Sequence, residues 1–166
     1  SKISRVGSTP YHNGQLTGVN LTETDQFALD GQRLLLKEGT HGADGAVYET
    51  ENFSNVKVIA KGTFGNGIFG PSYFEVLYPD GSKAYYGKGE KSSDPLQYNI
   101  SSWENAIGIS IIYKYVKVNN MSLPDVINYQ GGSISFTYDP IPRKRPISFY
   151  VAGIYFENIR PLLSID

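Results

Sequence analysis

Apolar and polar side chains alternate along much of this chain. The clearest example is the stretch 131–138, Gly-Gly-Ser-Ile-Ser-Phe-Thr-Tyr. Ile134, Phe136 and Tyr138 fall on one face of an extended strand, and the hydroxyl residues between them fall on the other. This period of two predicts a half-buried β-strand, and the glycine pair before it supplies the positive φ angles of a hairpin turn. We therefore expect Phe136 and its two apolar neighbours to face the core.

Further strands are predicted by the same alternation, with turn residues about every eight to twelve positions. Pro-Asp-Gly-Ser at 79–82 is a turn sequence, so we expect residues 73–78 and 83–86 to form one hairpin. The longest predicted strand is 107–118, and shorter ones lie at 56–60, 126–129, 147–151 and 154–156. This pattern favours an all-β fold, an antiparallel meander of hairpins that forms a curved sheet or a sandwich.

Two segments lack the alternation. Residues 40–45 are rich in glycine and are predicted to form a loop. Residues 87–102 are polar, and we expect a long connection there that holds at most one helical turn leading into Trp103. Because Gly or Pro interrupts nearly every window, no helix of useful length is predicted.

Length and composition indicate a single β-rich segment spanning 1–166. The chain has 166 residues, and 40% of them are hydrophobic, which is sufficient for one core. Both ends are apolar and strand-like, whereas domain ends are usually polar and frayed. We therefore expect a fragment of a longer protein.

Charge and cysteine content exclude several classes of function. A formal net charge of -1 gives no electrostatic reason to bind nucleic acid, and the short basic run at 143–145 is predicted to be a solvated turn between two prolines. Without cysteine the chain has no disulfide, thiolate metal site or cysteine nucleophile. It also lacks an apolar run of about 18 residues, the length that spans a membrane.

Candidate catalytic residues are few. His41 with Asp44 is a possible metal-ligating or acid–base pair, but two polar residues of a glycine-rich loop are the favoured interpretation. Glu49 and Glu51 would face one side of a strand, where a solvated face is favoured over a glycosidase carboxylate pair. We expect no enzyme activity, no catalytic residue, no cofactor and no metal site.

Aromatic residues offer one candidate binding site. Trp103, Tyr85 and Tyr86 are candidates for stacking on a ligand such as a sugar ring, although most of the 13 Tyr and 8 Phe must serve the core or cross-strand pairs. A carbohydrate-binding or cell-surface-binding β-module is therefore the alternative to a structural role.

An ordered set of segments resembles a known family. They are Phe-Ala-Leu-Asp-Gly-Gln-Arg-Leu at 27–34, Tyr-Phe-Glu-Val-Leu-Tyr-Pro-Asp-Gly-Ser-Lys-Ala-Tyr-Tyr-Gly at 73–87, Ile-Ile-Tyr-Lys-Tyr at 111–115, Leu-Pro-Asp-Val-Ile-Asn-Tyr at 123–129 and Arg-Pro-Leu-Leu-Ser-Ile at 160–165. In this order they resemble the SpvB-like region of bacterial virulence proteins and of the insecticidal toxin complex B component, which is related to RHS/YD-repeat proteins. The resemblance covers essentially the whole chain.

The resemblance implies a structural role. Regions of this family build β-sheet shells that enclose or present a toxic payload, and the poisonous activity lies in a separate domain. It implies a secreted or extracellular bacterial protein whose partners are other segments of its own parent toxin. A glycan or a host surface is a further partner to consider, whereas nucleic acid and a membrane span are not expected.

Overall fold

The computed structural model describes residues 1–52, 54–158 and 160–166, and β-strands dominate this part of the chain. All of its strand pairings are antiparallel. The elements are β1 (Lys2–Val6), α1 (Pro10–Asn13), β2 (Gln26–Leu29), β3 (Gln32–Glu38), β4 (Val47–Thr50), β5 (Lys57–Lys61), β6 (Tyr73–Leu77), β7 (Lys83–Tyr86), β8 (Ser93–Asp94), β9 (Gln97–Glu104), β10 (Ser110–Val118), β11 (Met121–Tyr129), β12 (Gly132–Tyr138), β13 (Ile147–Val151), β14 (Ile154–Asn158) and β15 (Leu162–Ile165). The predicted all-β class and antiparallel meander are confirmed.

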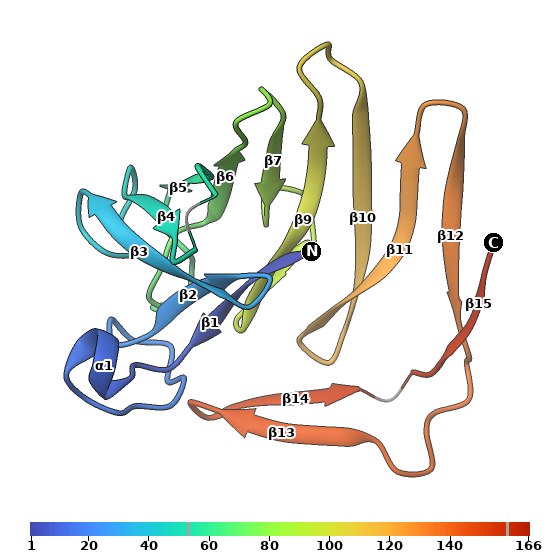
Figure 1. The fold of residues 1–166 in the computed structure, drawn as a ribbon. Helices are drawn as coiled ribbons and strands as arrows, with labels where there is room; N and C mark the ends of the chain where they lie inside the picture. The colour runs from blue at the N-terminus through green and yellow to red at the C-terminus, as the bar shows by residue number, and fades with distance from the viewer. Residues whose placement is uncertain (53, 159) are drawn as a thin grey trace.

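The first part of the meander closes on itself. Strands β1 to β7 follow one another around a ring, and β9 completes the ring by pairing with both β7 and β1 (Figure 1). The predicted curved sheet or sandwich is therefore corrected to a closed antiparallel barrel with additional strands. Closure leaves these strands without a free hydrogen-bonding edge over most of their length.

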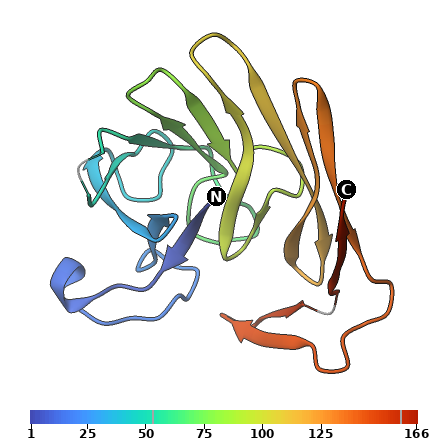
Figure 2. The ribbon, with the colours of Figure 1, turned by 45° about the vertical axis from the view of Figure 1, so that its right-hand side comes forward.

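Strand β9 also connects the barrel to the second part of the fold, because it pairs with β10 as well. Its residues 97–99 pair with β1, whereas its residues 102–104 pair with β10. From β10 the meander continues through β11 and β12 to β15, and we call these four strands the open sheet (Figure 2). Strands β13 and β14 form a separate two-stranded ribbon.

The core lies inside the barrel. Inward positions alternate along each strand, as in the burial of Phe74 and Val76 on β6 opposite Tyr86 and Ala84 on β7. Aromatic rings meet edge to face there, with ring centroids of Phe74 and Tyr98 4.9 Å apart. Such contacts add to the free energy of burial. The predicted 73–86 hairpin is confirmed, with Gly81 in its turn at φ 85°.

A buried ion pair also lies within the barrel. Arg5 points inward from β1, and its Nη1 lies 3.7 Å from Oδ2 of Asp25. Its Nε donates to the carbonyl of Pro95 at 2.8 Å, which ties β1 to the turn that leads into β9. Asp25 accepts the backbone N–H groups of Asn20 and Leu21. These hydrogen bonds compensate for much of the cost of removing two charges from water.

Two sequence predictions about strand boundaries were wrong. The polar segment 87–102, predicted as a long connection with a helical turn, contains β8 and most of β9. Ser101 is accommodated on β9 because its Oγ donates to the Tyr85 carbonyl of β7 at 3.0 Å. The strand predicted at 107–118 begins at Ser110, because the Asn105 side chain accepts the N–H groups of Ile107 and Ile109 and fixes a turn.

Truncating a barrel side chain should destabilise the fold strongly. Phe74 is fully buried, so we expect Phe74→Ala to lower the free energy of unfolding by about 3–5 kcal/mol. Ile107 is 81% exposed, and Ile107→Ala should change it by less than about 0.5 kcal/mol. Urea unfolding of both variants measures the difference, and similar losses would contradict the placement of the core inside the barrel.

Candidate interaction surface

The three aromatic residues proposed for ligand stacking do not share a surface. Tyr86 is 1% exposed inside the barrel. Trp103 pairs with Ala84, so it lies on the same side of the sheet as Tyr86 and packs partly against the core. Tyr85 lies on the outer side, where Lys88 Nζ is 4.0 Å from its ring centroid. Ligand stacking therefore stays a prediction for Tyr85 alone.

The pairing of His41 with Asp44 is not formed. His41 Nε2 lies 2.6 Å from the Asp25 carbonyl, which can only accept, so this nitrogen donates. Nδ1 lies 3.0 Å from the Tyr48 hydroxyl. Asp44 instead accepts the backbone N–H of Gly62 at 2.7 Å. Burial raises the pKa of Tyr48, so its hydroxyl remains a donor. Both ring nitrogens of His41 thus hold loops in place.

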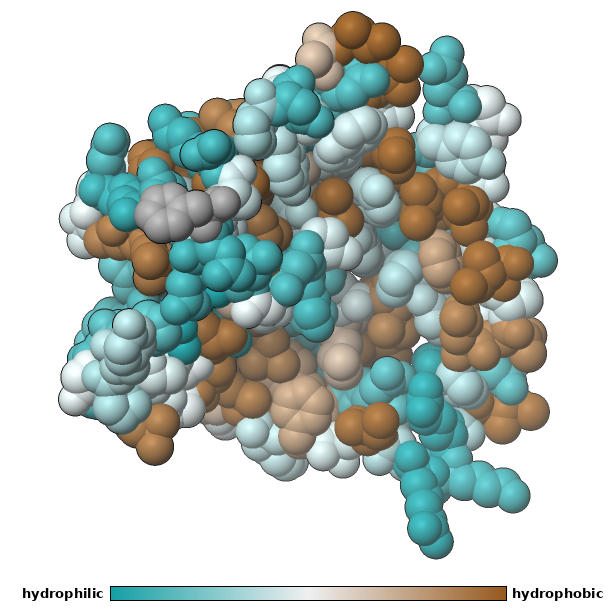
Figure 3. Space-filling model, viewed as in Figure 1, coloured by the Kyte–Doolittle hydropathy of each residue, from teal (hydrophilic) through white to brown (hydrophobic). Residues whose placement is uncertain are grey.

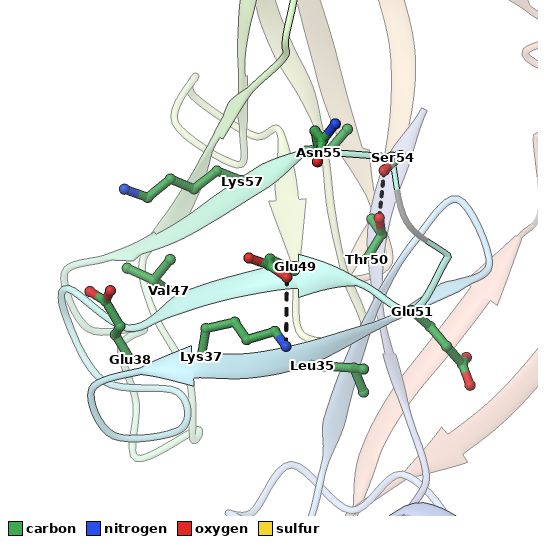
Figure 4. A pocket seen from close by; sticks show the side chains of 11 residues that line it. Leu35, Lys37, Glu38, Val47, Glu49, Thr50, Glu51, Ser54, Asn55 and Lys57 are labelled. Carbon is green, nitrogen blue, oxygen red and sulfur yellow. Dashed lines mark hydrogen bonds and ion pairs between the residues drawn. The ribbon is translucent and has the colours of Figure 1, made fainter.

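The two strand glutamates also have separate partners. Glu49 forms an ion pair with Lys37 at 3.6 Å, in a shallow groove on the outside of β3, β4 and β5 (Figure 4). Glu51 points away from Glu49 and lies 2.9 Å from Nε2 of His12. Within the described residues no group of three or more His, Asp and Glu side chains is placed to hold a metal ion. The groove offers an exposed ion pair, which contributes about 0–1 kcal/mol.

The open sheet has a different character from the barrel. Of the described residues beyond Ser101, Ser122 and Phe156 are buried, and the others are half-buried or exposed. Phe136, predicted to face a core, is half-buried because the described residues place no second layer over it. Hydrophobic surface gathers along this side of the molecule (Figure 3). Large exposed apolar patches are typical of surfaces that another protein segment covers.

Strand β15 gives this surface a free edge. It pairs with β12 on one side, and the described residues provide no strand on its other side. Leu162, Leu163 and Ile165 are 49%, 61% and 58% exposed. Edge strands are often protected by Lys, Pro or a bulge. The Leu-Leu-Ser-Ile sequence of β15 contains neither Lys nor Pro, although its pairing with β12 is irregular at Leu163, between the Tyr138–Leu162 and Thr137–Ser164 pairs.

Comparisons with known proteins show which solved structures share this fold. No protein-family model and no curated protein matches the sequence. The N-terminal domain of effector protein SpvB from Salmonella typhimurium strain LT2 superposes with a TM-score of 0.71 at 16% identity, over 99% of this chain and 73% of that one. The chain has the fold of the SpvB N-terminal domain. The resemblance drawn from the sequence is thereby confirmed at the level of fold.

Two larger structures contain the same SpvB-type fold. The TcdB2-TccC3 crystal structure matches with a TM-score of 0.68 at 14% identity, over 99% of this chain. The TcdB2-TccC3-Cdc42 structure matches with a TM-score of 0.66 at 14% identity, over the same share of this chain. The present chain spans 11% of each of those chains. In both, therefore, the SpvB-type fold is one segment of a much longer polypeptide.

A buried carboxylate joins the barrel to the open sheet. Asp94, 2% exposed, accepts the N–H groups of Leu96 and Gln97 on Oδ1 and that of Ser122 on Oδ2 at 3.3 Å. Ser122 Oγ donates to the Lys91 carbonyl at 2.7 Å. Burial raises the pKa of Asp94 above 3.8, although the N–H donors and the charge of Lys117 oppose the rise. The sequence gives no signal for this contact, because its partners lie in separate hairpins.

The helical part of the structure is small. No helix in the described part of the chain is long and apolar enough to span a membrane. Helix α1 begins after Thr9 as its N-cap and contains no buried residue.

Asp94 should make the stability of this chain depend on pH. Because the pKa of Asp94 is raised in the folded state, the folded chain keeps the carboxyl proton after the unfolded chain has released it. The contribution of protonated Asp94 to the free energy of unfolding is therefore lost as pH rises above about 4. We therefore expect the free energy of unfolding of the wild type to fall relative to Asp94→Asn between about pH 3 and pH 7. Urea unfolding over a pH series measures this difference.

Asp80 provides a control of opposite sign. Its side chain accepts the Ser82 hydroxyl and N–H, which lowers its pKa. The ionised Asp80 carboxylate therefore stabilises the folded state at neutral pH, and this stabilisation is lost in acid. The free energy of unfolding of the wild type should rise relative to that of Asp80→Asn as pH rises. If both comparisons had the same sign, the assignment of Asp94 as a desolvated carboxyl would be wrong.

Proposed function

We propose that residues 1–166 form a non-catalytic structural segment of a larger, secreted bacterial toxin-like protein, where they contribute to a β-sheet wall that encloses or presents a toxic payload. The observation that carries this proposal is the contrast between the two halves of the molecule. The barrel is a complete core, whereas the open sheet has exposed apolar side chains and a free edge at β15. Such a sheet is suited to continue into neighbouring protein.

The fold comparison supports the toxin context. The matched solved structures are an effector protein domain and TcdB2-TccC3 structures in which the fold is one small segment. A wall built from strands satisfies its backbone N–H and C=O groups within the sheet, so it can separate an interior from solvent without buried unpaired groups. The partners of the open sheet would be other segments of the parent protein, and secretion follows from that context.

The absence of catalysis is part of the proposal. Both nitrogens of each histidine are already within hydrogen-bond distance of a partner, with His12 near Thr9 and Glu51 and His41 near Tyr48 and Asp25. We assign both rings a structural role, in which these contacts hold neighbouring segments of the chain together. No metal or cofactor is required in this arrangement.

Placing charged side chains on the open edge of β15 should weaken self-association of the isolated chain. In the isolated chain β15 has no covering segment, so we expect molecules to pair through it and associate as concentration rises. Leu163→Glu with Ile165→Glu places charge on this strand and should raise the dissociation constant at least about tenfold. Sedimentation velocity over a concentration series measures the change.

A matched variant controls for added charge. Tyr11 and Leu16 are 90% and 79% exposed and lie outside the open sheet, so Tyr11→Glu with Leu16→Glu introduces the same charge elsewhere. Its association should equal that of the wild type. A wild-type chain that stays monomeric at high concentration would count against a surface that needs a neighbour.

Removal of divalent metals should leave the fold unchanged. Because no metal is required in the proposed arrangement, EDTA is expected to shift the melting temperature by less than about 2 °C. Differential scanning calorimetry with and without the chelator measures this shift. A large drop that added metal reverses would overturn the metal-free part of the proposal.

A further inference from the structure

The loop that connects β12 to β13 has a fixed base and a free tip. At its base, the backbone N–H of Asp139 donates to the Pro161 carbonyl at 2.9 Å, and Asp139 Oδ1 accepts the N–H of Ile141 at 2.8 Å. Arg160 Nη1 donates to the carbonyls of Asp139 and Pro140. Beyond this clamp the chain turns at the lower right of Figure 1, where hydrophilic side chains project from the surface in Figure 3.

The tip carries three consecutive basic residues. Arg143, Lys144 and Arg145 are exposed, and the described residues provide them with no hydrogen bond or ion pair. Pro142 and Pro146 flank them. The chain bends at Lys144 and Arg145, outside any strand. Exposed loop tips are the preferred sites of proteolysis.

The chain's other basic residues are held more firmly. Nine of them lie within strands: Lys2, Arg5, Arg33, Lys37, Lys57, Lys61, Lys83, Lys114 and Lys117. Of those in loops, Lys88 packs over the Tyr85 ring, and the Lys91 carbonyl accepts the Ser122 hydroxyl. Arg160 forms the clamp at the loop base. A protease that selects basic residues would therefore meet its most accessible bonds at 143–145.

We propose that this loop is a processing site for an endoprotease specific for basic residues. The protease catalyses addition of water across the Arg143–Lys144 or the Lys144–Arg145 peptide bond. The C–N bond breaks, a carboxylate forms on the first residue, and an amino group forms on the second. The Arg145–Pro146 bond is resistant, because the proline ring replaces the N–H group and restricts the approach of a protease to this bond.

The fold holds both products together after the cut. Ser135 on β12 exchanges two backbone hydrogen bonds with Asp166, at 2.6 and 2.8 Å, so β15 stays paired. The ribbon contributes Phe156, which is fully buried and stacks on Phe149 with ring centroids 5.4 Å apart. Asn120 also donates to the Tyr155 carbonyl at 2.9 Å. Cleavage thus divides the chain between β12 and β13, and the fragment that contains β13, β14 and β15 stays attached through the β12–β15 pairing and the Asn120–Tyr155 contact.

Limited trypsin digestion of the folded chain tests the cleavage site. The first products, identified by intact-mass spectrometry, should end at Arg143 or Lys144. Arg143→Gln with Lys144→Gln and Arg145→Gln should slow loss of the intact chain about tenfold or more, whereas Lys88→Gln with Lys91→Gln should leave the rate unchanged. First cleavage elsewhere, or equal rates for the wild type and the triple variant, would overturn the proposal.

Two further measurements test the details. Pro146→Ala should add a cut after Arg145, because it removes the protection of that bond. On size-exclusion chromatography the wild-type digestion products should elute together in buffer and separately in urea. Separate elution in buffer would show that strand pairing does not hold the products and would refute processing without release.

Discussion

Strand β9 is the constraint on which the rest of the structure depends. It closes the barrel by pairing with β1 and β7, and it also pairs with β10 to begin the open sheet. The closed ring and the open sheet therefore share one backbone, and neither can shift register without disturbing the other. Asp94 reinforces this junction by accepting N–H groups from the turn before β9 and from β11.

Barrel closure also creates the environment of the Arg5–Asp25 pair. The Arg5 guanidinium lies 5.6 Å from the Phe27 ring centroid and 5.8 Å from that of Phe64, which places its charge against aromatic faces. Removing one member of such a buried pair is destabilising by about 3–5 kcal/mol, because the other charge is left uncompensated. The hydrogen bond from Arg5 Nε to the Pro95 carbonyl joins β1 to the turn before β9.

The two halves differ because a closed barrel has an inside and a single open sheet does not. Inward side chains of β1 to β9 meet one another, so Phe74 and Tyr98 are fully buried. The corresponding positions of β12 have no opposing layer within the described residues, and Phe136 stays half-buried although its strand has the same alternation. The same fold occurs as one segment of much longer chains in the TcdB2-TccC3 structures.

The sequence by itself determined the features that depend on near neighbours: the all-β class, the 73–86 hairpin and the presence of a hairpin turn before β12. That turn lies at Gln130-Gly131, one residue before the predicted glycine pair, and Gly132 already belongs to β12. Alternation and turn residues suffice there, because strand partners joined by a short turn are held close by the chain. Tertiary structure alone decided the closure through β9, the Arg5–Asp25 pair and the opposite faces of Tyr85 and Trp103. Arg5 and Pro95 are 90 residues apart, and alternation shows that a strand has two faces without showing which face another layer will cover.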